Sequence, residues 1–247
     1  MKQGKVTVII QAHMASTRLP GKILKDLHGE PVLYRVIERV RHSKLIDEIV
    51  IATSLMDCDD AIIEACDKWG VKTFRGSNED VLARYWGAAQ EFPSDYYVRM
   101  TSDDPVTDPG IVDRIIQFFL DSDYNYVTYA LDPDQHHNLC DGMGCEVFTA
   151  ALLDEAYHNA TLPYEHEHVT PYMYYTNKSK GQFPYDRDES AYRLTLDTPE
   201  DYQLICAVYD ALYQPGNTFT LDEVLAYLDS HPDVYAINAK IQQKKVR

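Results

Sequence analysis

Two cations lie in a loop that directly follows the first predicted strand. Residues 11–22 read QAHMASTRLPGK, with Arg18 and Lys22 among small residues. In open parallel sheets, ligands bind beyond the carboxyl ends of the strands. Small residues there can turn backbone N–H groups toward phosphate oxygens, while the two cations supply fixed positive charge. The loop matches neither a Walker A loop nor the G-x-G-x-x-G fingerprint, so we expect a different kind of phosphate site.

Two aspartates at the ends of two other predicted strands are not needed as helix caps. Asp103 follows a strand over 96–100, and Asp197 follows a strand over 192–196. Neither is needed as a helix cap, because Asp108 and Thr198, each directly before a proline, already serve that purpose. Mg²⁺ bound to a nucleotide takes one or two carboxylates, with phosphates and waters completing its shell. We therefore expect Asp103 and Asp197, 94 residues apart in the chain, to share Mg²⁺.

Strands and helices alternate over the first 120 residues. Short, β-branched apolar runs are typical of buried parallel strands, and they occur at 6–10, 48–53, 71–74 and 96–100. Apolar residues at helical spacing lie between these runs, and Ser77 to Asp80 has the spacing of a capping box. The alternation predicts an α/β fold with a mostly parallel sheet and helices on both faces.

The later part of the chain has a weaker pattern. The stretch from about 132 to 190 is rich in His and Tyr and has little periodicity. We expect it to be an irregular insertion, used for acceptor binding or dimerisation, within a single domain that spans 1–247. A strand over 192–196, a helix after Thr198 and a final helix from Thr220 follow it.

Charge and composition exclude several classes of protein. The net charge of −16 disfavours a nucleic-acid partner, which would need clustered cations. Residues 1–44 nevertheless carry nine Lys or Arg against three Asp or Glu. Four of these cations are expected to be exposed to solvent on a helix or just after it, namely Arg35, Arg39, Arg41 and Lys44. No apolar run is long enough to span a membrane. Five cysteines without a C-x-x-C pair indicate a reducing, cytoplasmic compartment.

These motifs resemble those of a known family. Residues 11–22 match the pattern Q-A-R-M-G-S-T-R-L-P-G-K at ten of twelve positions. The pattern belongs to the cytidylyltransferase-type family that includes the spore coat polysaccharide biosynthesis protein F group, related to the CMP-sialate and CMP-Kdo synthetases. Further likeness covers nearly the whole chain, at 74–77, 80–85, 101–109, 167–171 and 193–201.

The resemblance implies a Rossmann-like nucleotidyltransferase fold and a homodimer. It also implies transfer of CMP from CTP to a sugar or sugar-acid acceptor, with release of pyrophosphate, in surface polysaccharide or glycan biosynthesis. By motif match, Arg18 and Lys22 would be catalytic and hold triphosphate oxygens, and Asp103 and Asp197 would hold Mg²⁺. The implied nucleotide contacts are Gln11, Ala12, His13, Met14, Ala15, Ser16, Arg75, Ser77, Asp80, Val81 and Ser102.

Three departures from the family pattern keep alternatives open. His13 stands where the family has Arg, Ala15 stands where it has Gly, and Ser102 to Pro105 replaces Gly-Asp-Cys-Pro. The first change removes a permanent, bidentate phosphate partner, and the second adds a Cβ where the backbone approaches phosphate. The alternatives are a catalytically weakened nucleotide-binding protein and a nucleotide-sugar-dependent glycosyltransferase. The nucleotide could also be a triphosphate other than CTP.

Overall fold

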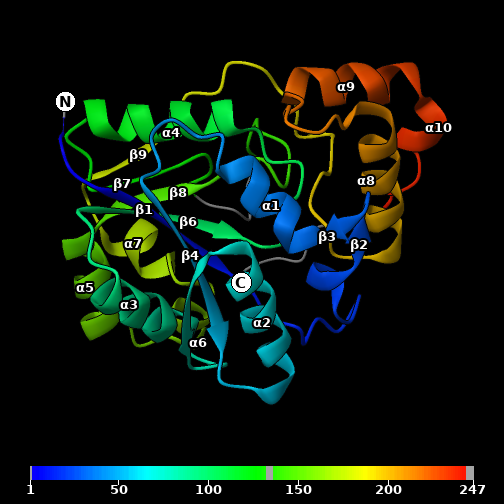
Figure 1. The fold of residues 1–247 in the computed structure, drawn as a ribbon. Helices are drawn as coiled ribbons and strands as arrows, with labels where there is room; N and C mark the ends of the chain where they lie inside the picture. The colour runs from blue at the N-terminus through cyan, green and yellow to red at the C-terminus, as the bar shows by residue number, and fades with distance from the viewer. Residues whose placement is uncertain (1, 132–135, 243–247) are drawn as a thin grey trace.

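The computed structural model describes residues 2–131 and 136–242 of the chain (Figure 1). Its centre is a seven-stranded sheet with the strand order β5-β4-β1-β6-β8-β7-β9. The first four strands in that order are parallel to one another, which confirms the predicted α/β fold. Their bounds are Lys72–Gly76 for β5, Glu48–Ser54 for β4, Val6–Gln11 for β1 and Tyr96–Thr101 for β6.

The other three strands come later in the chain and complete the same sheet. β8 (Glu146–Thr149) lies antiparallel between β6 and β7 (Tyr126–Thr128), and β9 (Lys180–Gln182) is parallel to β7 at the edge. Both β8 and β9 belong to the stretch 132–190, of which 132–135 lie outside the described residues. The prediction that this stretch is irregular is therefore wrong. Strands of three or four residues are too short to show a periodic pattern.

Both faces of the sheet are buried, because alternate residues of β1 enter two separate cores. Val8 and Ile10 belong to one core and Ile9 to the other. The first core is covered by α1 (Val32–Val40), α2 (Asp60–Trp69), α4 (Pro109–Asp121), α8 (Pro199–Leu212) and α9 (Leu221–Ser230). The second is covered by α3 (Val81–Glu91), α5 (Ala150–Asn159) and α7 (Pro171–Thr176). Figure 1 shows α4 and α3 on opposite sides of the sheet.

Several short elements connect these layers. They are η1 (Lys22–Leu24), the hairpin of β2 (Asp26–Leu27) with β3 (Glu30–Pro31), η2 (Asp57–Asp59), α6 (Pro163–His168) and α10 (Pro232–Tyr235). α8, α9 and α10 lie together at one end of the molecule (Figure 1). Over the two described ranges, every helix is too short or too polar to cross a lipid bilayer.

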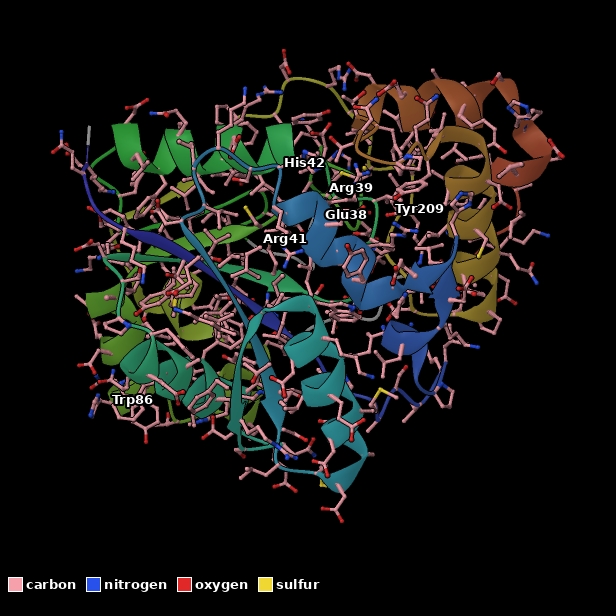
Figure 2. All side chains as sticks on the ribbon, viewed as in Figure 1. Glu38, Arg39, Arg41, His42, Trp86 and Tyr209 are labelled. Carbon is pink, nitrogen blue, oxygen red and sulfur yellow. The ribbon has the colours of Figure 1, made fainter. Side chains whose placement is uncertain are left out.

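Arg35 and Arg39 join α1 to the C-terminal helices. They are only 3% and 2% exposed, and Arg39 donates to two backbone carbonyl oxygens, one of which is that of Phe219 at 2.5 Å. Figure 2 shows Arg39 on the side of α1 toward Tyr209 of α8. The prediction that these two side chains are solvated is wrong, because the helices that cover them come from the distant end of the chain. The other two cations, at and beyond the end of α1, are exposed as expected.

Most helix starts agree with the sequence prediction. Asp108, Thr198 and Thr220 each accept a hydrogen bond from a backbone N–H of the first helical turn. At α3 the prediction is displaced: Asp80 is the N-cap, while Ser77 accepts the backbone N–H of Asp80 at 3.0 Å. Two short polar side chains three residues apart can each cap a helix, and the one adjacent to the apolar run does so here.

Residues 192–196 do not form the predicted strand. Among the described residues, the single bridge of this segment pairs Arg193 with Asp141. The loop at Gly142 approaches so closely that an added Cβ would lie 2.6 Å from backbone atoms of Leu194 and Thr195. The segment is thus fixed by a loop instead of a neighbouring strand, and the apolar alternation alone could not distinguish the two.

Candidate functional site

Lys22 lies at the centre of a charged cluster beyond the carboxyl ends of β1 and β6. Its Nζ donates to Asp103 Oδ2 at 2.6 Å, to Asp197 Oδ1 at 2.9 Å and to the carbonyl oxygen of Leu196 at 2.8 Å. Burial by itself lowers the pKa of Lys22, but the charges of the two carboxylates outweigh burial, so the pKa is raised. Lys22 is therefore a fixed cation that holds together two aspartates from distant parts of the chain.

Asp197 is surrounded by three cations. Its Oδ1 accepts from Lys22, and its Oδ2 lies 2.9 Å from Arg18 Nη2 and 2.9 Å from Arg193 Nη2. Burial by itself raises the pKa of Asp197. The charges of Lys22 and Arg18 lower it by more, so the pKa lies below its ordinary value. Asp197 is therefore a carboxylate at neutral pH. The structure brings together all four residues that the sequence singled out, Arg18, Lys22, Asp103 and Asp197.

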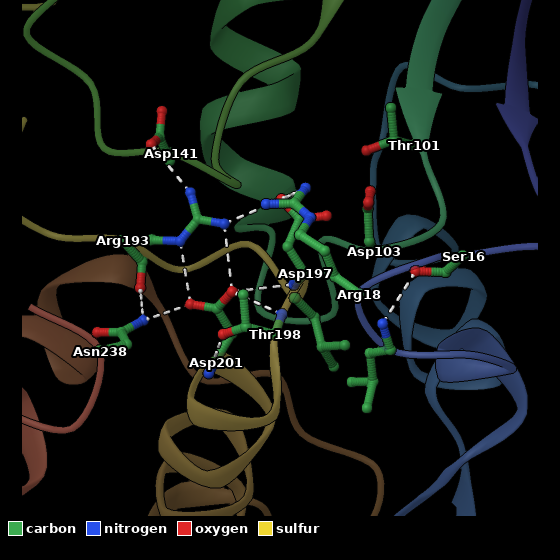
Figure 3. Close-up of polar contacts among 12 residues, drawn as sticks. Ser16, Arg18, Thr101, Asp103, Asp141, Arg193, Asp197, Thr198, Asp201 and Asn238 are labelled. Atoms are coloured by element: carbon green, nitrogen blue, oxygen red, sulfur yellow. Dashed lines mark hydrogen bonds and ion pairs between the residues drawn. The ribbon is translucent and has the colours of Figure 1, made fainter. Parts of the chain in front are cut away.

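A buried aspartate at the start of α8 fixes the position of Arg193. Asp201 is 0% exposed; its Oδ1 accepts from Arg193 Nε at 3.0 Å and from Asn238 Nδ2 at 2.8 Å. Its Oδ2 accepts the backbone N–H groups of Asp197 and Thr198, each at 3.0 Å. Figure 3 shows the guanidinium of Arg193 held in this way beside Asp197. Asp201 thus orients both the backbone and the cationic neighbour of Asp197.

A cavity of about 330 Å³ opens beside this cluster. Arg18, Asp103 and Asp197 line one part of its wall. The other part is lined by aromatic, hydroxyl and acidic side chains, among them Thr128, Tyr129, Glu146, His168, Thr170 and Tyr174. The charged cluster and the cavity are therefore one continuous site.

The charges deeper in this cavity are paired with each other. Glu146 on β8 lies 2.5 Å from Arg99 Nη1 on β6, and its other oxygen accepts from the hydroxyls of Tyr126 at 2.5 Å and Thr170 at 2.7 Å. Burial and the charge of Asp103 raise the pKa of Asp104, which also lines the cavity. This part of the site is polar but nearly neutral.

The backbone of the loop after β1 makes several hydrogen bonds within the protein. Ala12 N donates to Ala52 O at 3.0 Å, and Met14 N donates to Asp59 Oδ1 at 2.8 Å. Ser16 N donates to Met14 O at 2.9 Å. These N–H groups are engaged, so a phosphate at this loop would depend mainly on Arg18, on Lys22 and on other N–H groups, such as that of Ala15.

His13 does not replace the charge of the family's arginine. Burial, followed by the charge of Lys22, lowers the pKa of His13, and the charge of Arg84 lowers it further. The neutral imidazole is therefore favoured at pH 7. At the adjacent strand end, Ser102 N donates to Gln11 O at 3.2 Å, which joins β6 to β1, and the side-chain oxygen of Gln11 is buried without a hydrogen-bond partner among the described residues.

The more distant predicted nucleotide contacts have local partners. Arg75 donates to the carbonyl oxygens of Ser54 and Met56 and pairs with Asp60 at 2.6 Å, so it ties β5 to the β4–α2 connection. Ser77 and Asp80 shape the start of α3 as described above. Asp80 also lies 3.0 Å from His166 Nδ1, and Val81 belongs to the second core. The structure does not bring these four residues into the Lys22 cluster.

Asp103 and Asp197 fit the small carboxylate set that a nucleotide-bound Mg²⁺ needs. Both carboxylates already bind the ammonium of Lys22. Leu196 N also donates to Asp103 O at 2.8 Å, which fixes the loop of Asp103 against the segment that precedes Asp197. Within the described residues, no group of three or more His, Cys, Asp or Glu side chains is placed to bind a metal. Mg²⁺ would therefore depend on nucleotide phosphates for much of its shell.

The site also contains four residues that were not predicted from the sequence, namely Arg99, Glu146, Arg193 and Asp201. Arg193 and Asp201 lie four residues to either side of Asp197. The signal available for Asp201 was its place, next to Glu200, in the first turn of a predicted helix. Glu146 had no comparable signal, because its position depends on the insertion of β8 between β6 and β7.

Comparison with protein families gives one match over most of the chain. Residues 7–232 match the family model described as cytidylyltransferase. The spore coat polysaccharide biosynthesis protein SpsF of Bacillus subtilis is 35% identical to this chain, with 92% of the chain and 95% of that protein covered.

Solved structures show the same architecture. A cytidylyltransferase from Leptospira borgpetersenii is 32% identical, with a TM-score of 0.87, and the match covers 97% of this chain and 99% of that one. CMP:2-keto-3-deoxy-manno-octonic acid synthetase complexed with CTP is 18% identical, with a TM-score of 0.63, over 83% of this chain and 98% of that one. At that identity, the second likeness concerns the fold alone.

Proposed function

The chain belongs to the cytidylyltransferase family and is a nucleotidyltransferase, and from this premise we propose that it transfers CMP from CTP to a sugar or sugar-acid acceptor in surface polysaccharide or glycan biosynthesis. Pyrophosphate would be the second product. A homodimer in the cytoplasm is a further part of this proposal. The observation that carries the proposal is the ammonium of Lys22, which joins Asp103 and Asp197 on the wall of a cavity.

The proposed reaction is an in-line displacement at the α-phosphorus of CTP. An acceptor oxygen forms a bond to this phosphorus while the bond to the bridging oxygen of the β-phosphate breaks. Pyrophosphate leaves, and the proton of an attacking hydroxyl passes to water. The protein has little covalent chemistry to perform, so positioning and charge stabilisation account for most of the rate.

Arg18 and Lys22 would stabilise the negative charge that develops on the phosphates. Lys22 is held in place by two carboxylates, whereas the side chain of Arg18 is 43% exposed and has Asp197 as its ion-pair partner. Arg18 can therefore turn from Asp197 to a phosphate more readily than Lys22 can. Asp103 and Asp197 would hold Mg²⁺, which when bound supplies positive charge to the phosphate oxygens.

The acceptor would occupy the deeper part of the cavity. Thr128, Tyr129 and Thr170 provide hydroxyl groups there, while Glu146 is neutralised by Arg99. Hydroxyl groups both donate and accept hydrogen bonds, as the hydroxyls of a sugar do. Aromatic rings in the same wall provide surface for the apolar face of a sugar ring.

The direct test measures pyrophosphate release from CTP and Mg²⁺ with a panel of sugar acids and phosphorylated sugars. We expect Asp103→Asn and Asp197→Asn to lower the rate by about 10²-fold or more, since each change removes a metal ligand. Asp186→Asn, at an exposed position away from the cluster, is the matched control and should retain the wild-type rate. Circular dichroism checks that each variant remains folded.

Other results would support a different function. Rates within a few-fold of wild type in both cluster variants would contradict the metal assignment. Transfer from a nucleotide-sugar, without pyrophosphate release from CTP, would support the glycosyltransferase alternative. CTP binding without turnover on the whole panel would support the catalytically weakened protein that His13 and Ala15 suggested.

A further inference from the structure

Arg99, in the wall of the deeper part of the cavity, is already bound to a carboxylate. It lies directly opposite Glu146 in the register of β6 and β8, and its Nη1 is 2.5 Å from Glu146 Oε2. The other oxygen of Glu146 accepts from the hydroxyls of Tyr126 at 2.5 Å and Thr170 at 2.7 Å. Two paired strands and two hydroxyl groups therefore fix Glu146 on Arg99. An acceptor carboxylate would have to displace this buried side chain to reach the guanidinium.

Carboxyl groups outnumber guanidinium groups in the wall of the cavity. Over the described residues, the cavity is lined by five carboxyl groups and two guanidinium groups, and each guanidinium already pairs with a carboxylate. Burial raises the pKa of Tyr129, and three carboxyl groups near its hydroxyl raise it further, those of Asp141, Glu146 and Asp104. An acceptor carboxylate would add a further negative charge to this group, and neither guanidinium is free to offset it.

Three polar atoms on residues of the same wall have no hydrogen-bond partner among the described residues. They are Arg99 Nε, Asp104 Oδ1 and the hydroxyl oxygen of Tyr174, whose side chain is only 3% exposed. A buried polar group without a partner costs free energy until a ligand supplies one. The set contains a donor, a carboxyl oxygen and a hydroxyl. Sugar hydroxyls, which donate and accept, can serve every member of this set, whereas a carboxylate can only accept.

We infer that the acceptor is an uncharged sugar, and that Glu146 rejects sugar acids by occupying Arg99. This inference rests on the proposed function and decides between its two classes of acceptor. The chemical step is the same: a sugar hydroxyl oxygen forms a bond to the α-phosphorus, pyrophosphate leaves, and the hydroxyl proton passes to water. Glu146 takes no part in that step. It determines specificity, because it cancels the positive charge that an acceptor carboxylate would need.

Matched pairs of sugars test the class of acceptor in the wild-type protein. Each pair contains a neutral sugar and the uronic acid of the same stereochemistry, such as glucose with glucuronate and galactose with galacturonate. Pyrophosphate release from CTP and Mg²⁺ gives kcat/KM for each member. We expect kcat/KM to be about tenfold or more higher for the neutral member, because the acid would lack a partner for its charge.

Glu146→Gln tests the role of the carboxylate itself. Glutamine keeps the size of the side chain and an oxygen that can accept from Tyr126 and Thr170, but it leaves the charge of Arg99 without a partner. We expect the ratio of kcat/KM for the acid to that for the neutral sugar to rise by about tenfold or more. Both values come from one preparation, so a lower folded fraction does not alter the ratio.

Two further variants serve as controls. The double variant Arg99→Met, Glu146→Gln also removes the guanidinium, so the rise in the ratio should disappear. Glu64→Gln removes a carboxylate at an exposed position on α2, outside the lining of the cavity, and should keep the wild-type ratio.

Each other outcome has a definite meaning. Equal values for the two members in the wild type, or a preference for the acids, would overturn the inference. An unchanged ratio in Glu146→Gln, a rise that persists in the double variant, or loss of all turnover in a folded Glu146→Gln would also overturn it. If Glu146→Gln does not fold, the wild-type preference still decides the class of acceptor. An absence of pyrophosphate release with both members of every pair would instead contradict the proposed function.

Discussion

Lys22 and Arg84 are both buried cations whose charges act on His13, and their surroundings are built in opposite ways. In the Lys22 cluster every charge has a partner within the protein: Lys22 holds two carboxylates, and Arg193 holds Asp197 and Asp201. Arg84, by contrast, has Nε and Nη1 buried without an acceptor among the described residues.

The difference shows what each region contributes before a ligand binds. The Lys22 cluster is organised in the free protein, since its ion pairs offset the desolvation of its charges. It therefore adds to stability and presents fixed charges to the reaction. Arg84 gains nothing comparable, because its Nε and Nη1 are buried without an acceptor among the described residues, so it should add little to the stability of the free protein. The following predictions test this contrast.

Loss of Asp201 should have the largest effect on stability. Asp201→Ala leaves Arg193 and Asn238 without their buried acceptor and removes the acidic half of the capping box of α8. We expect the free energy of unfolding to fall by about 3–5 kcal/mol, the range for breaking one side of a buried ion pair. Urea denaturation followed by circular dichroism measures the change.

A carboxylate on the same helix provides the control for Asp201. Asp210 has a side chain that is 74% exposed, and Asp210→Ala should change stability by less than about 1 kcal/mol. If both variants behave alike, the buried network around Arg193 does not stabilise the protein, and the contrast with Arg84 fails.

Replacement of Lys22 should have the largest effect on turnover. Lys22→Met leaves Asp103 and Asp197 facing each other without the ammonium that joins them, and it removes a cation from the proposed triphosphate site. We expect the rate of pyrophosphate release to fall by about 10²–10³-fold. Lys25→Met, at a half-buried lysine three residues farther along, should retain most activity, and equal losses in the two variants would contradict a specific role for Lys22.

The two regions also differ in how far the sequence could predict them. Arg18 and Lys22 follow β1, Asp103 follows β6, and the carboxyl ends of parallel strands meet at one edge of a sheet. Asp103 and Asp197 are also not needed as helix caps, because Asp108 and Thr198 cap the helices that follow them. The convergence of Arg18, Lys22 and Asp103 follows from strand order, whereas Asp197 joins them from a segment that a loop, and not a neighbouring strand, holds in place.

What the sequence could not predict depends on contacts between distant segments. Glu146 enters the site because β8 lies antiparallel between β6 and β7, and a four-residue strand carries no signal of its partners. The segment with Arg193 appeared as a strand because apolar alternation does not reveal whether a neighbouring strand or a loop supports it. Arg84 Nε and Nη1 lack an acceptor among the described residues because of what surrounds them after folding, so residue type and spacing gave no indication.

A methyl group placed against the stem of Arg84 should have a smaller, intermediate effect. In Gly76→Ala, the new Cβ would lie 3.0 Å from Arg84 Cγ and 3.0 Å from Phe74 Cε1, so a neighbour must move by a few tenths of an ångström. We expect the free energy of unfolding to fall by about 1–3 kcal/mol, because the added methyl group overfills a packed site. Urea denaturation followed by circular dichroism measures the change, and an unchanged free energy of unfolding would contradict the close packing of Gly76 against Arg84 and Phe74.

The smallest effect should come from His13, on whose imidazole the charges of Lys22 and Arg84 both act. Burial and the charges of Lys22 and Arg84 lower the pKa of His13 in the folded state below its unfolded value of about 6.5. The unfolded chain then binds more protons just below that pH, so the contribution of His13 makes stability fall as the pH falls through this window. His13→Gln should reduce the loss of unfolding free energy between pH 7.5 and pH 5.5 by less than about 1 kcal/mol. His42→Gln, at an exposed position, should leave the loss unchanged. Because Arg84 contributes to the lowered pKa, the effect of His13→Gln should be smaller in the Arg84→Met background; an unchanged effect would mean that the charge of Arg84 does not reach His13.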